Sequence, residues 1–246
     1  MDRALPRLHH QGVRDECLDG LDEVELEAQI ERNGYARTGA VLTGAECAGL
    51  AGLHDDERLF RSRVVMEHHR FGVGEYKYFA RPLPPLVESL RTRLYVPLAA
   101  IANRWMEALG EARRFPASLE AFLDQCAAAG QHEPTPLLLR YETGGYNCLH
   151  QDLYGAVAFP LQVAVMLTEP GRDYEGGEFL LVEQRPRAQS AGAAILAAQG
   201  EMVVFPNRLR PVKGSRGYYR VNVRHGVSRV RAGRRFTLGL IFHDAC

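Results

Sequence analysis

Two histidines and one carboxylate occupy positions from which they could bind one metal ion. His150 and Asp152 are separated by a single residue, and His225 follows far downstream. On an extended strand, side chains two residues apart point to the same face, so His150 and Asp152 could contact the same ion. The third ligand would come from elsewhere in the fold, as it can in a barrel whose strands face each other. Two histidines and one carboxylate, with coordination positions left open, form a ligand set that suits Fe(II).

A candidate carboxylate-binding pair follows the second histidine. Arg235 lies ten residues after His225, and Thr237 shares its face of a predicted strand. A guanidinium group can bind both oxygens of a carboxylate. The neighbouring Arg234 has the opposite parity, together with the apolar Phe236, and is the weaker candidate. The combination predicts an Fe(II) enzyme that uses 2-oxoglutarate, whose far carboxylate would meet Arg235 and Thr237 while its other end chelates the iron.

The elements expected to position these residues begin with a helical region. Up to about residue 133 the apolar spacing is mostly helical. The predicted helices cover 21–33, ended by Gly34; a segment opened by the capping box of Thr43 and Glu46; 85–110, where Pro97 should kink or divide the helix; and 118–130. Residues 63–80 have an aromatic, turn-interrupted sequence that predicts a hairpin.

After Pro136 the pattern changes to short β-like runs separated by turns. The predicted strands cover 137–142, 146–152, 161–169, 177–182, 201–205, 218–230 and 235–243. Many short strands at this spacing are typical of a sandwich or barrel, and the helices would then back one sheet, so the predicted fold class is α+β. No linker rich in Pro or Gly separates the two regions, so we expect 1–135 and 136–246 to form one domain.

Five motifs follow one another in the second region. They are Arg140-Tyr141-x-x-Gly144, His150-x-Asp152, Glu175-Gly176-Gly177-Glu178-Phe179, Gly200-Glu201-Met202-Val203-Val204-Phe205, and His225 followed by Gly233-x-Arg235. In this order and spacing, the chain from about Leu137 to Asp244 resembles the double-stranded β-helix (jelly-roll) core of 2-oxoglutarate/Fe(II)-dependent dioxygenases. Among these it is nearest to the prolyl-4-hydroxylase-like branch.

The resemblance implies a role for each site residue. His150, Asp152 and His225 would bind Fe(II), Arg235 would bind the distal carboxylate of 2-oxoglutarate, and Tyr141 would border this cosubstrate. The resemblance also implies O2 as a cosubstrate, succinate and CO2 as products, and ascorbate as a reductant that rescues oxidised iron. Halogenating relatives lack the carboxylate ligand, so the presence of Asp152 favours hydroxylation.

Two features depart from the family pattern. Residues 207–223 form a longer link before the second histidine than is usual. Some relatives carry a tyrosine that contacts the cosubstrate on the strand after the His-x-Asp motif. At that place this chain has Gln162, Ala164 and Met166.

The substrate is less constrained by the sequence. Ten basic residues and no acidic one occur between 208 and 235. They either attract an anion to the site or pair with acidic residues such as those at 22–31. A peptidyl side chain or a free amino acid is the expected substrate, and the aromatic segment 76–79 would cover a peptide as a lid. Nucleic acid is disfavoured because the formal net charge is +0 and no base-flipping loop is recognisable. Oxidative demethylation of nucleic acid and a non-catalytic β-barrel that binds metal or ligand are the alternatives.

The composition and the remaining cysteines and histidines lead to further predictions. Hydrophobic residues make up 46% and charged residues 24% of the chain, as in ordinary globular domains. Five scattered cysteines without a Cys-x-x-Cys motif predict reduced thiols and a cytoplasmic protein, and no secretory or membrane-spanning stretch is visible. Cys148 is expected either to line the pocket or, with more weight, to be a small buried filler. His243 is assigned a structural or surface role, and the pairs His9-His10 and His68-His69 are expected at the surface.

Overall fold

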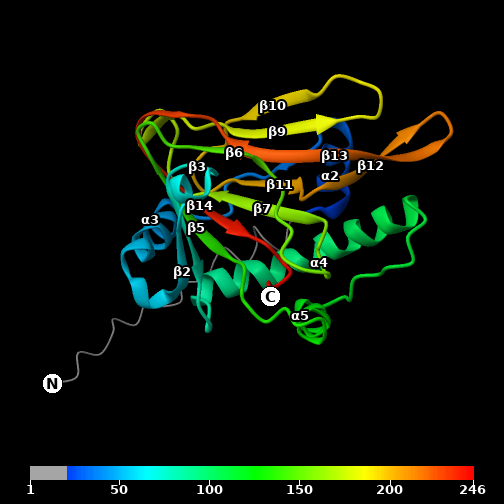
Figure 1. Cartoon of the computed structure of the whole chain (residues 1–246), viewed down its shortest axis with the longest axis horizontal. Helices are drawn as coiled ribbons and strands as arrows, with labels where there is room; N and C mark the ends of the chain where they lie inside the picture. The colour runs from blue at the N-terminus through cyan, green and yellow to red at the C-terminus, as the bar shows by residue number, and fades with distance from the viewer. Residues whose placement is uncertain (1–20) are drawn as a thin grey trace.

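Two antiparallel β-sheets face each other in this protein, and helices cover the outer side of one of them (Figure 1). The structure, a computed structural model, describes residues 21–246. The expected surface position of His9 and His10 lies outside the described residues. The architecture confirms the predicted α+β class with a double-stranded β-helix core.

The larger sheet carries at its centre the strand of Arg235 and Thr237, the pair predicted to bind a carboxylate and called the carboxylate clamp below. Its strands run in the order β1-β11-β7-β14-β5-β4-β2, and β8 also pairs with β14. Their bounds are β1 (Ala36–Arg37), β2 (Phe60–Val65), β4 (Glu75–Phe79), β5 (Leu137–Glu142), β7 (Leu161–Met166), β8 (Tyr174–Gly176), β11 (Met202–Pro206) and β14 (Val230–Leu240).

The smaller sheet carries the two histidines of the predicted metal site. Its strands run in the order β10-β9-β13-β6-β3, and β12 pairs with β13. Their bounds are β3 (Gly72–Val73), β6 (Tyr146–His150), β9 (Phe179–Gln184), β10 (Ala191–Ile195), β12 (Leu209–Gly214) and β13 (Gly217–Val227). The predicted hairpin in 63–80 is present, because β2 pairs with β4, and β4 then continues the larger sheet beside β5.

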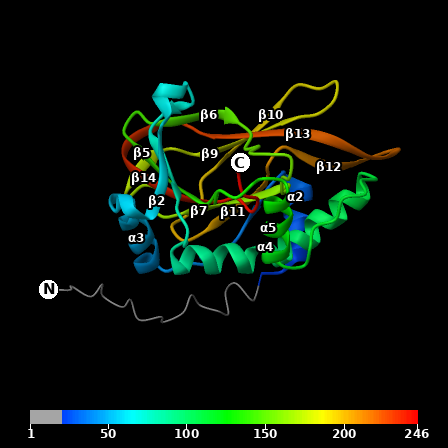
Figure 2. The same ribbon diagram turned by 60° about the horizontal axis from the view of Figure 1, so that its bottom comes forward.

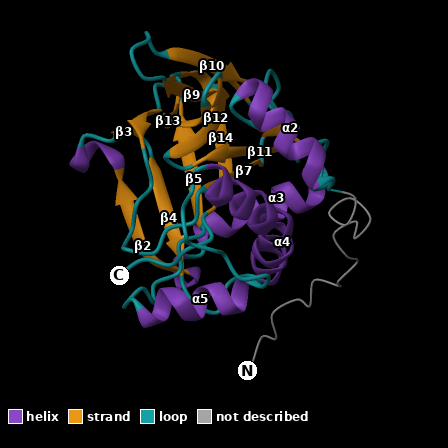
Figure 3. Cartoon of the chain, turned by 90° about the vertical axis from the view of Figure 1, so that its right-hand side faces the viewer, coloured by secondary structure: helices purple, strands orange, loops and turns teal. Residues whose placement is uncertain are grey.

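The helices gather on one side of the molecule, behind the larger sheet (Figure 3). They are α2 (Glu23–Asn33), α3 (Gly44–Gly52), α4 (Pro85–Ala108) and α5 (Leu119–Ala128), with short 3-10 turns η1 (Leu53–Asp55), η2 (Glu57–Leu59) and η3 (Met66–His69). Helix α2 ends as predicted at Gly34, which has a φ of 87°, and Thr43 and Glu46 form the predicted capping box of α3.

Helix α4 runs as one element through Pro97, so of the predicted kink or division at this residue the division does not occur. The buried face of α4, which includes Leu90, Leu94 and Leu98, shares one core with Val163 and Leu240 on the outer face of the larger sheet. Burial of these side chains along the whole helix outweighs the one backbone hydrogen bond that a proline removes.

One strand prediction needs correction, and the strands β10 and β12 were not predicted. The strand predicted at 146–152 ends at His150, so Asp152 lies in the following loop. The alanine-rich patch around residue 191 forms strand β10, which pairs with β9. The long link at 207–223 is a β-hairpin of β12 and β13, which extends outward from the smaller sheet (Figure 2). Within residues 21–246, none of the helices combines the length and apolar composition needed to cross a bilayer.

Candidate active site

The structure brings His150, Asp152 and His225 together at one end of the space between the sheets. One ligand atom from each residue lies within 4.8 Å of the others. The distance from His225 Nε2 to Asp152 Oδ2 is 3.3 Å, and the distance from His150 Nε2 to Asp152 Oδ1 is 3.5 Å. The ring centroids of the two histidines are 4.2 Å apart. Two imidazole nitrogens and one carboxylate that converge on one point could hold a divalent metal ion such as Fe(II).

Strand pairing sets the positions of the two imidazoles. His225 on β13 lies directly opposite His150 on β6 in the antiparallel register. The adjacent Gly226 permits this close approach, because a Cβ atom there would lie 2.7 Å from the carbonyl oxygen of Asn147. The Nδ1 atom of His150 donates a hydrogen bond of 2.8 Å to the carbonyl oxygen of Cys148. That bond leaves the Nε2 lone pair of His150 free to bind a metal.

Asp152 is held by the loop that follows β6 rather than by the strand itself. Its backbone N–H donates to Asn207 Oδ1 over 3.1 Å, and its Oδ1 accepts a hydrogen bond of 2.6 Å from the Tyr154 hydroxyl. The Tyr78 hydroxyl in turn donates to that of Tyr154 over 2.9 Å. Burial acts to raise the pKa of Asp152, but the hydrogen bond and charge of His225 outweigh it and hold this pKa well below its usual value. The carboxylate is therefore ionised and ready to bind a cation.

Arg235 and Thr237 lie side by side on β14 and face the space between the sheets. Arg235 is only 2% exposed, and its guanidinium donates to Thr237 Oγ1 over 2.6 Å and to the sulfur of Met166 over 3.5 Å. Its Nε atom has no hydrogen-bond partner, and no carboxylate among residues 21–246 lies within 4.0 Å of it. A buried cation without a counter-ion is costly, so this guanidinium fits the carboxylate of a bound ligand.

Tyr141 lies on β5 next to this guanidinium. The centroid of its ring is 5.6 Å from Arg235 Cζ, and its hydroxyl accepts a hydrogen bond of 3.3 Å from Asn147. Burial raises the pKa of Tyr141 to about 12, so the hydroxyl stays protonated and can donate to a ligand. The structure thus places Tyr141 at the end of the space where the carboxylate clamp lies.

One cavity of about 400 Å³ connects the metal-site residues with the clamp. Its lining includes all six residues singled out from the sequence: His150, Asp152, His225, Arg235, Thr237 and Tyr141. Much of the remaining lining is apolar or aromatic. Phe179 and Phe205 pack against the ring of His225, at centroid distances of 5.9 and 4.7 Å. The residues present fit an Fe(II) ion at one end and a dicarboxylic acid that spans to the other.

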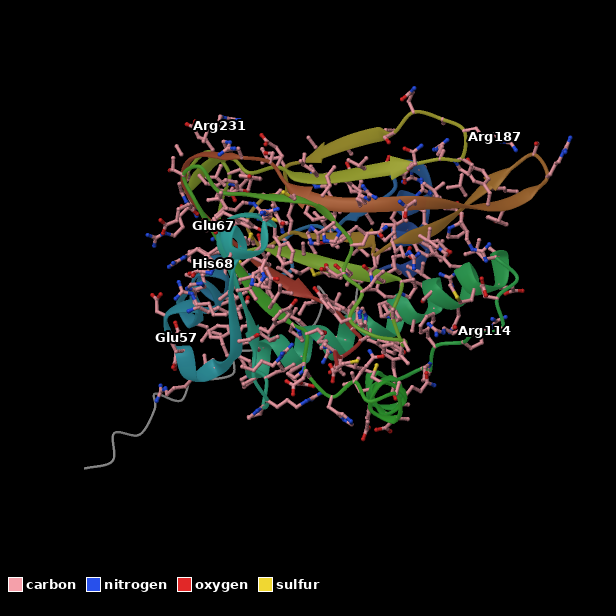
Figure 4. The ribbon with its side chains drawn as sticks, in the orientation of Figure 1. Glu57, Glu67, His68, Arg114, Arg187 and Arg231 are labelled. Carbon is pink, nitrogen blue, oxygen red and sulfur yellow. The ribbon has the colours of Figure 1, made fainter. Side chains whose placement is uncertain are left out.

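The structure corrects the interpretation of Cys148 and agrees with the positions expected for three other histidines. Cys148 is exposed and lines the cavity, so the buried-filler interpretation is wrong. His243 is fully buried, and its Nδ1 accepts a hydrogen bond from the backbone N–H of Phe159, which confirms a structural position. His68 and His69 are exposed on η3, as predicted, and Figure 4 shows His68 on the left-hand side of the molecule.

The basic run between 208 and 235 does not pair with the acidic helix α2, whose Glu23 and Glu27 bind Arg104 instead. Several of its arginines form ion pairs elsewhere: Arg210 with Glu183, Arg220 with Glu111, Arg231 with Glu178, and Arg234 with Glu142. Figure 4 shows Arg231, from the start of β14, at the upper left of the molecule. The run is therefore spread along the three strands β12, β13 and β14 and is partly neutralised, rather than gathered at the metal site.

Sequence reasoning missed Tyr154, Tyr78 and Asn207. Tyr154 could have been found, because it lies two residues after a candidate ligand and a tyrosine hydroxyl can reach a neighbouring carboxylate. Tyr78 and Asn207 come from distant elements, so only the fold brings them to Asp152. The segment at 76–79, predicted to act as a lid, is instead strand β4, whose Tyr76 and Tyr78 form part of the cavity wall.

The two facing sheets form the double-stranded β-helix fold that solved oxygenase structures share. A prolyl hydroxylase from Trichoplax adhaerens, solved in complex with a hypoxia inducible factor peptide fragment, superposes with a TM-score of 0.53 at 12% identity, covering 90% of this chain and 89% of that one. A 2OG-Fe(II) oxygenase family oxidoreductase from Burkholderia pseudomallei gives a TM-score of 0.51 at 18% identity, covering 92% and 93%. These likenesses support the fold.

Residues 74–245 match the family model Oxygenase-NA, described as an oxygenase catalysing oxidative methylation of damaged DNA, and the chain belongs to this family. Uncharacterized proteins from two strains of Mycobacterium tuberculosis are 48% identical to it over 190 residues, which cover 75% of this chain and 82% of theirs.

Proposed function

We propose that this protein is a hydroxylase in which His150, Asp152 and His225 hold Fe(II), while Arg235 and Thr237 bind the distal carboxylate of 2-oxoglutarate. The single observation that carries the proposal is the buried guanidinium of Arg235, which has no carboxylate within 4.0 Å among residues 21–246 and lines the same cavity as His150, Asp152 and His225. A dicarboxylic cosubstrate would supply the missing charge.

Bound Fe(II), with 2-oxoglutarate and O2, supplies the oxidising power to insert one oxygen atom into a substrate C–H bond, and the second oxygen atom leaves in succinate beside CO2. The protein's own residues orient the side chains that would bind the metal and keep water away from them. Cys148 fixes the tautomer of His150 through its carbonyl oxygen, and Tyr154 orients the carboxylate of Asp152. Phe179 and Phe205 keep water from one side of His225. We expect ascorbate to sustain turnover by reducing oxidised iron.

The cavity lining favours an uncharged substrate group. Apart from His150, Asp152 and His225, the only charged side chains that residues 21–246 contribute to this lining are Arg70 at the exposed rim and the buried Arg235. A free amino acid would bring an ammonium group for which this lining offers no carboxylate other than Asp152. A neutral group carried by a larger molecule, such as a peptidyl side chain, avoids that cost.

A second candidate substrate is an alkylated base in nucleic acid, and two observations favour it. The description of the matched family names damaged DNA. The cavity is also lined by the exposed Phe71 and the half-buried Tyr76, beside Arg70, and flat aromatic rings are surfaces on which a base can stack. Hydroxylation of an N-methyl group would release the methyl group as formaldehyde, so this chemistry would be oxidative demethylation.

Succinate release measured with two panels tests the proposal and separates the candidates. One panel holds peptides, the other methylated oligonucleotides, and mass spectrometry scores the gain of one oxygen or the loss of a methyl group. Turnover on oligonucleotides should fall steeply with salt, while turnover on peptides should not. Failure of the Fe(II)-loaded protein to bind 2-oxoglutarate, or equal succinate release by Asp152→Ala, would refute the enzyme assignment and favour a non-catalytic binding protein.

A further inference from the structure

The side-chain amide of Gln162 makes no hydrogen bond within residues 21–246. Gln162 lies on β7, is 3% exposed and borders the cavity, and its Nε2 atom is buried without a partner. Folded proteins satisfy nearly all buried polar groups, so an unpaired amide at a cavity wall points to a ligand. Gln151 offers a contrast, because it lines the same cavity but donates to Asn222 Oδ1 and to the carbonyl oxygen of Val223.

The register of the larger sheet separates Gln162 from the carboxylate clamp. Met166 lies opposite Thr237, and its sulfur accepts a hydrogen bond from Arg235. Gln162 is four residues away on β7 and has the same parity, so it lies about 13 Å farther along the strand. The amide of Gln162 therefore faces the end of the cavity opposite to Arg235.

The neighbours of Gln162 place it at the metal end. Gln162 pairs with Phe205 on β11, and the Phe205 ring centroid is 4.7 Å from that of His225. Between Gln162 and the clamp, Ala164 lies opposite Gly239, and these two small residues leave the floor of the cavity open. One elongated ligand can therefore lie over Ala164 with its two ends at Gln162 and Arg235.

We propose that Gln162 is a positioning residue that donates a hydrogen bond to the carboxylate adjacent to the ketone of 2-oxoglutarate, the end that faces the metal. This inference rests on the proposed function. A carboxylate only accepts hydrogen bonds, and the amide can turn about its last bond to present its NH2 group to the cavity. The bond would fix the orientation of the oxo acid end, while Arg235 fixes the other.

Ligand binding to the Mn(II)-loaded protein, measured by calorimetry, tests this assignment without turnover. The two ligands are 2-oxoglutarate and 2-oxovalerate, which has the same chain length and oxo acid end but no distal carboxylate. Gln162→Met removes the donor at similar volume, and Gln162→Glu places a negative charge there. Gln184→Met is the matched control, because this glutamine is exposed on β9 and does not line the cavity.

Gln162→Met is expected to weaken the binding of both ligands about tenfold, and Gln162→Glu more, whereas Gln184→Met leaves both affinities near those of the wild type. Arg235→Met should weaken 2-oxoglutarate alone. Unchanged affinity of Gln162→Met for 2-oxoglutarate overturns the proposal, and so does a loss confined to 2-oxoglutarate, which would place Gln162 at the distal carboxylate. Absence of 2-oxoglutarate binding in the wild type refutes the proposed function instead.

Discussion

The hydroxyl of Tyr154 donates a hydrogen bond of 2.6 Å to Oδ1 of Asp152, and the hydroxyl of Tyr78 donates to Tyr154 from behind. The chain of two hydroxyls fixes the carboxylate plane from the side of the larger sheet. Oδ2 of Asp152 is left facing His225.

Tyr154→Phe removes the donor without changing the ring. Groups that orient metal ligands typically contribute 10- to 100-fold in affinity, so we expect Mn(II) binding to weaken about tenfold. Tyr78→Phe, one bond farther away, should have a smaller effect, and Tyr218→Phe, exposed on the β12–β13 hairpin, none. Calorimetric titration of Mn(II) measures all three. Equal affinity for Tyr154→Phe and the wild type would show that Asp152 needs no support from this hydroxyl.

Removal of a metal-site residue should abolish both metal binding and succinate formation. Anaerobic addition of Fe(II) and 2-oxoglutarate to the wild type is expected to give a weak visible charge-transfer band, which Asp152→Ala and His225→Ala should lose. His68→Ala is the control, because this histidine is exposed on η3. A band that persists in Asp152→Ala would place the iron elsewhere.

Arg235→Met should change ligand affinity and stability in opposite directions. Without the guanidinium, we expect binding of 2-oxoglutarate to weaken about 100-fold, since a charge-assisted bidentate contact is lost. In the ligand-free protein, removal of a buried cation that lacks a counter-ion should raise the free energy of unfolding by about 1–3 kcal/mol. Calorimetry and urea unfolding measure the two effects. Arg234→Met, at the neighbouring exposed position, should show neither, and a destabilised Arg235→Met protein would contradict the assignment.

Acid should destabilise the protein in part through His243. Burial lowers the pKa of this histidine from 6.5 to about 4, so the native state favours its neutral form. The stability that comes from keeping His243 neutral is fully present above pH 6.5. As the pH falls toward 4, the free energy of unfolding should decrease by about 3 kcal/mol because of this residue. Urea unfolding at both pH values should therefore show a smaller loss for His243→Asn than for the wild type. His68→Gln should follow the wild type, and a wild-type slope in His243→Asn would refute this account.

Gly226→Ala should separate the strands that hold the two histidines. The added Cβ would lie 2.7 Å from the carbonyl oxygen of Asn147, and this backbone atom cannot move away cheaply. We expect a loss of about 1–3 kcal/mol in the free energy of unfolding, together with weaker Mn(II) binding. Gly39→Ala, whose Cβ would meet nothing within 4 Å, is the control. Wild-type stability in both variants would mean that β6 and β13 can move apart without cost.

Local patterns predicted the elements that depend on local interactions. The caps of α2 and α3 were predicted because Gly34 and the Thr43–Glu46 pair act within their own turns. The coming together of the three metal-site residues was expected from the order of the motifs. Strand β10 was missed because its alanines carry no alternating apolar pattern, and it forms only by pairing with β9.

Contacts between distant segments that no motif marks could not be predicted. The orientation of Asp152 depends on Tyr78 and Asn207, which come from strand β4 and from the start of the β12–β13 hairpin. The unpaired amide of Gln162 becomes visible only when every neighbour is placed. Burial along the whole of α4 likewise explains why Pro97 does not divide this helix, which was one of the two outcomes predicted from local propensity.

The position of each strand within its sheet gives the two ends of the cavity unequal protection against local opening. β14 lies between β5 and β7, so the amides around Arg235 should be among the slowest to exchange with deuterated solvent. β6 has the inner strand β13 on one side but only the two-residue β3 on the other, and its exchange should be faster. We therefore expect release of a metal ion to begin with local opening of β6 at His150, while His225 and Arg235 stay in place.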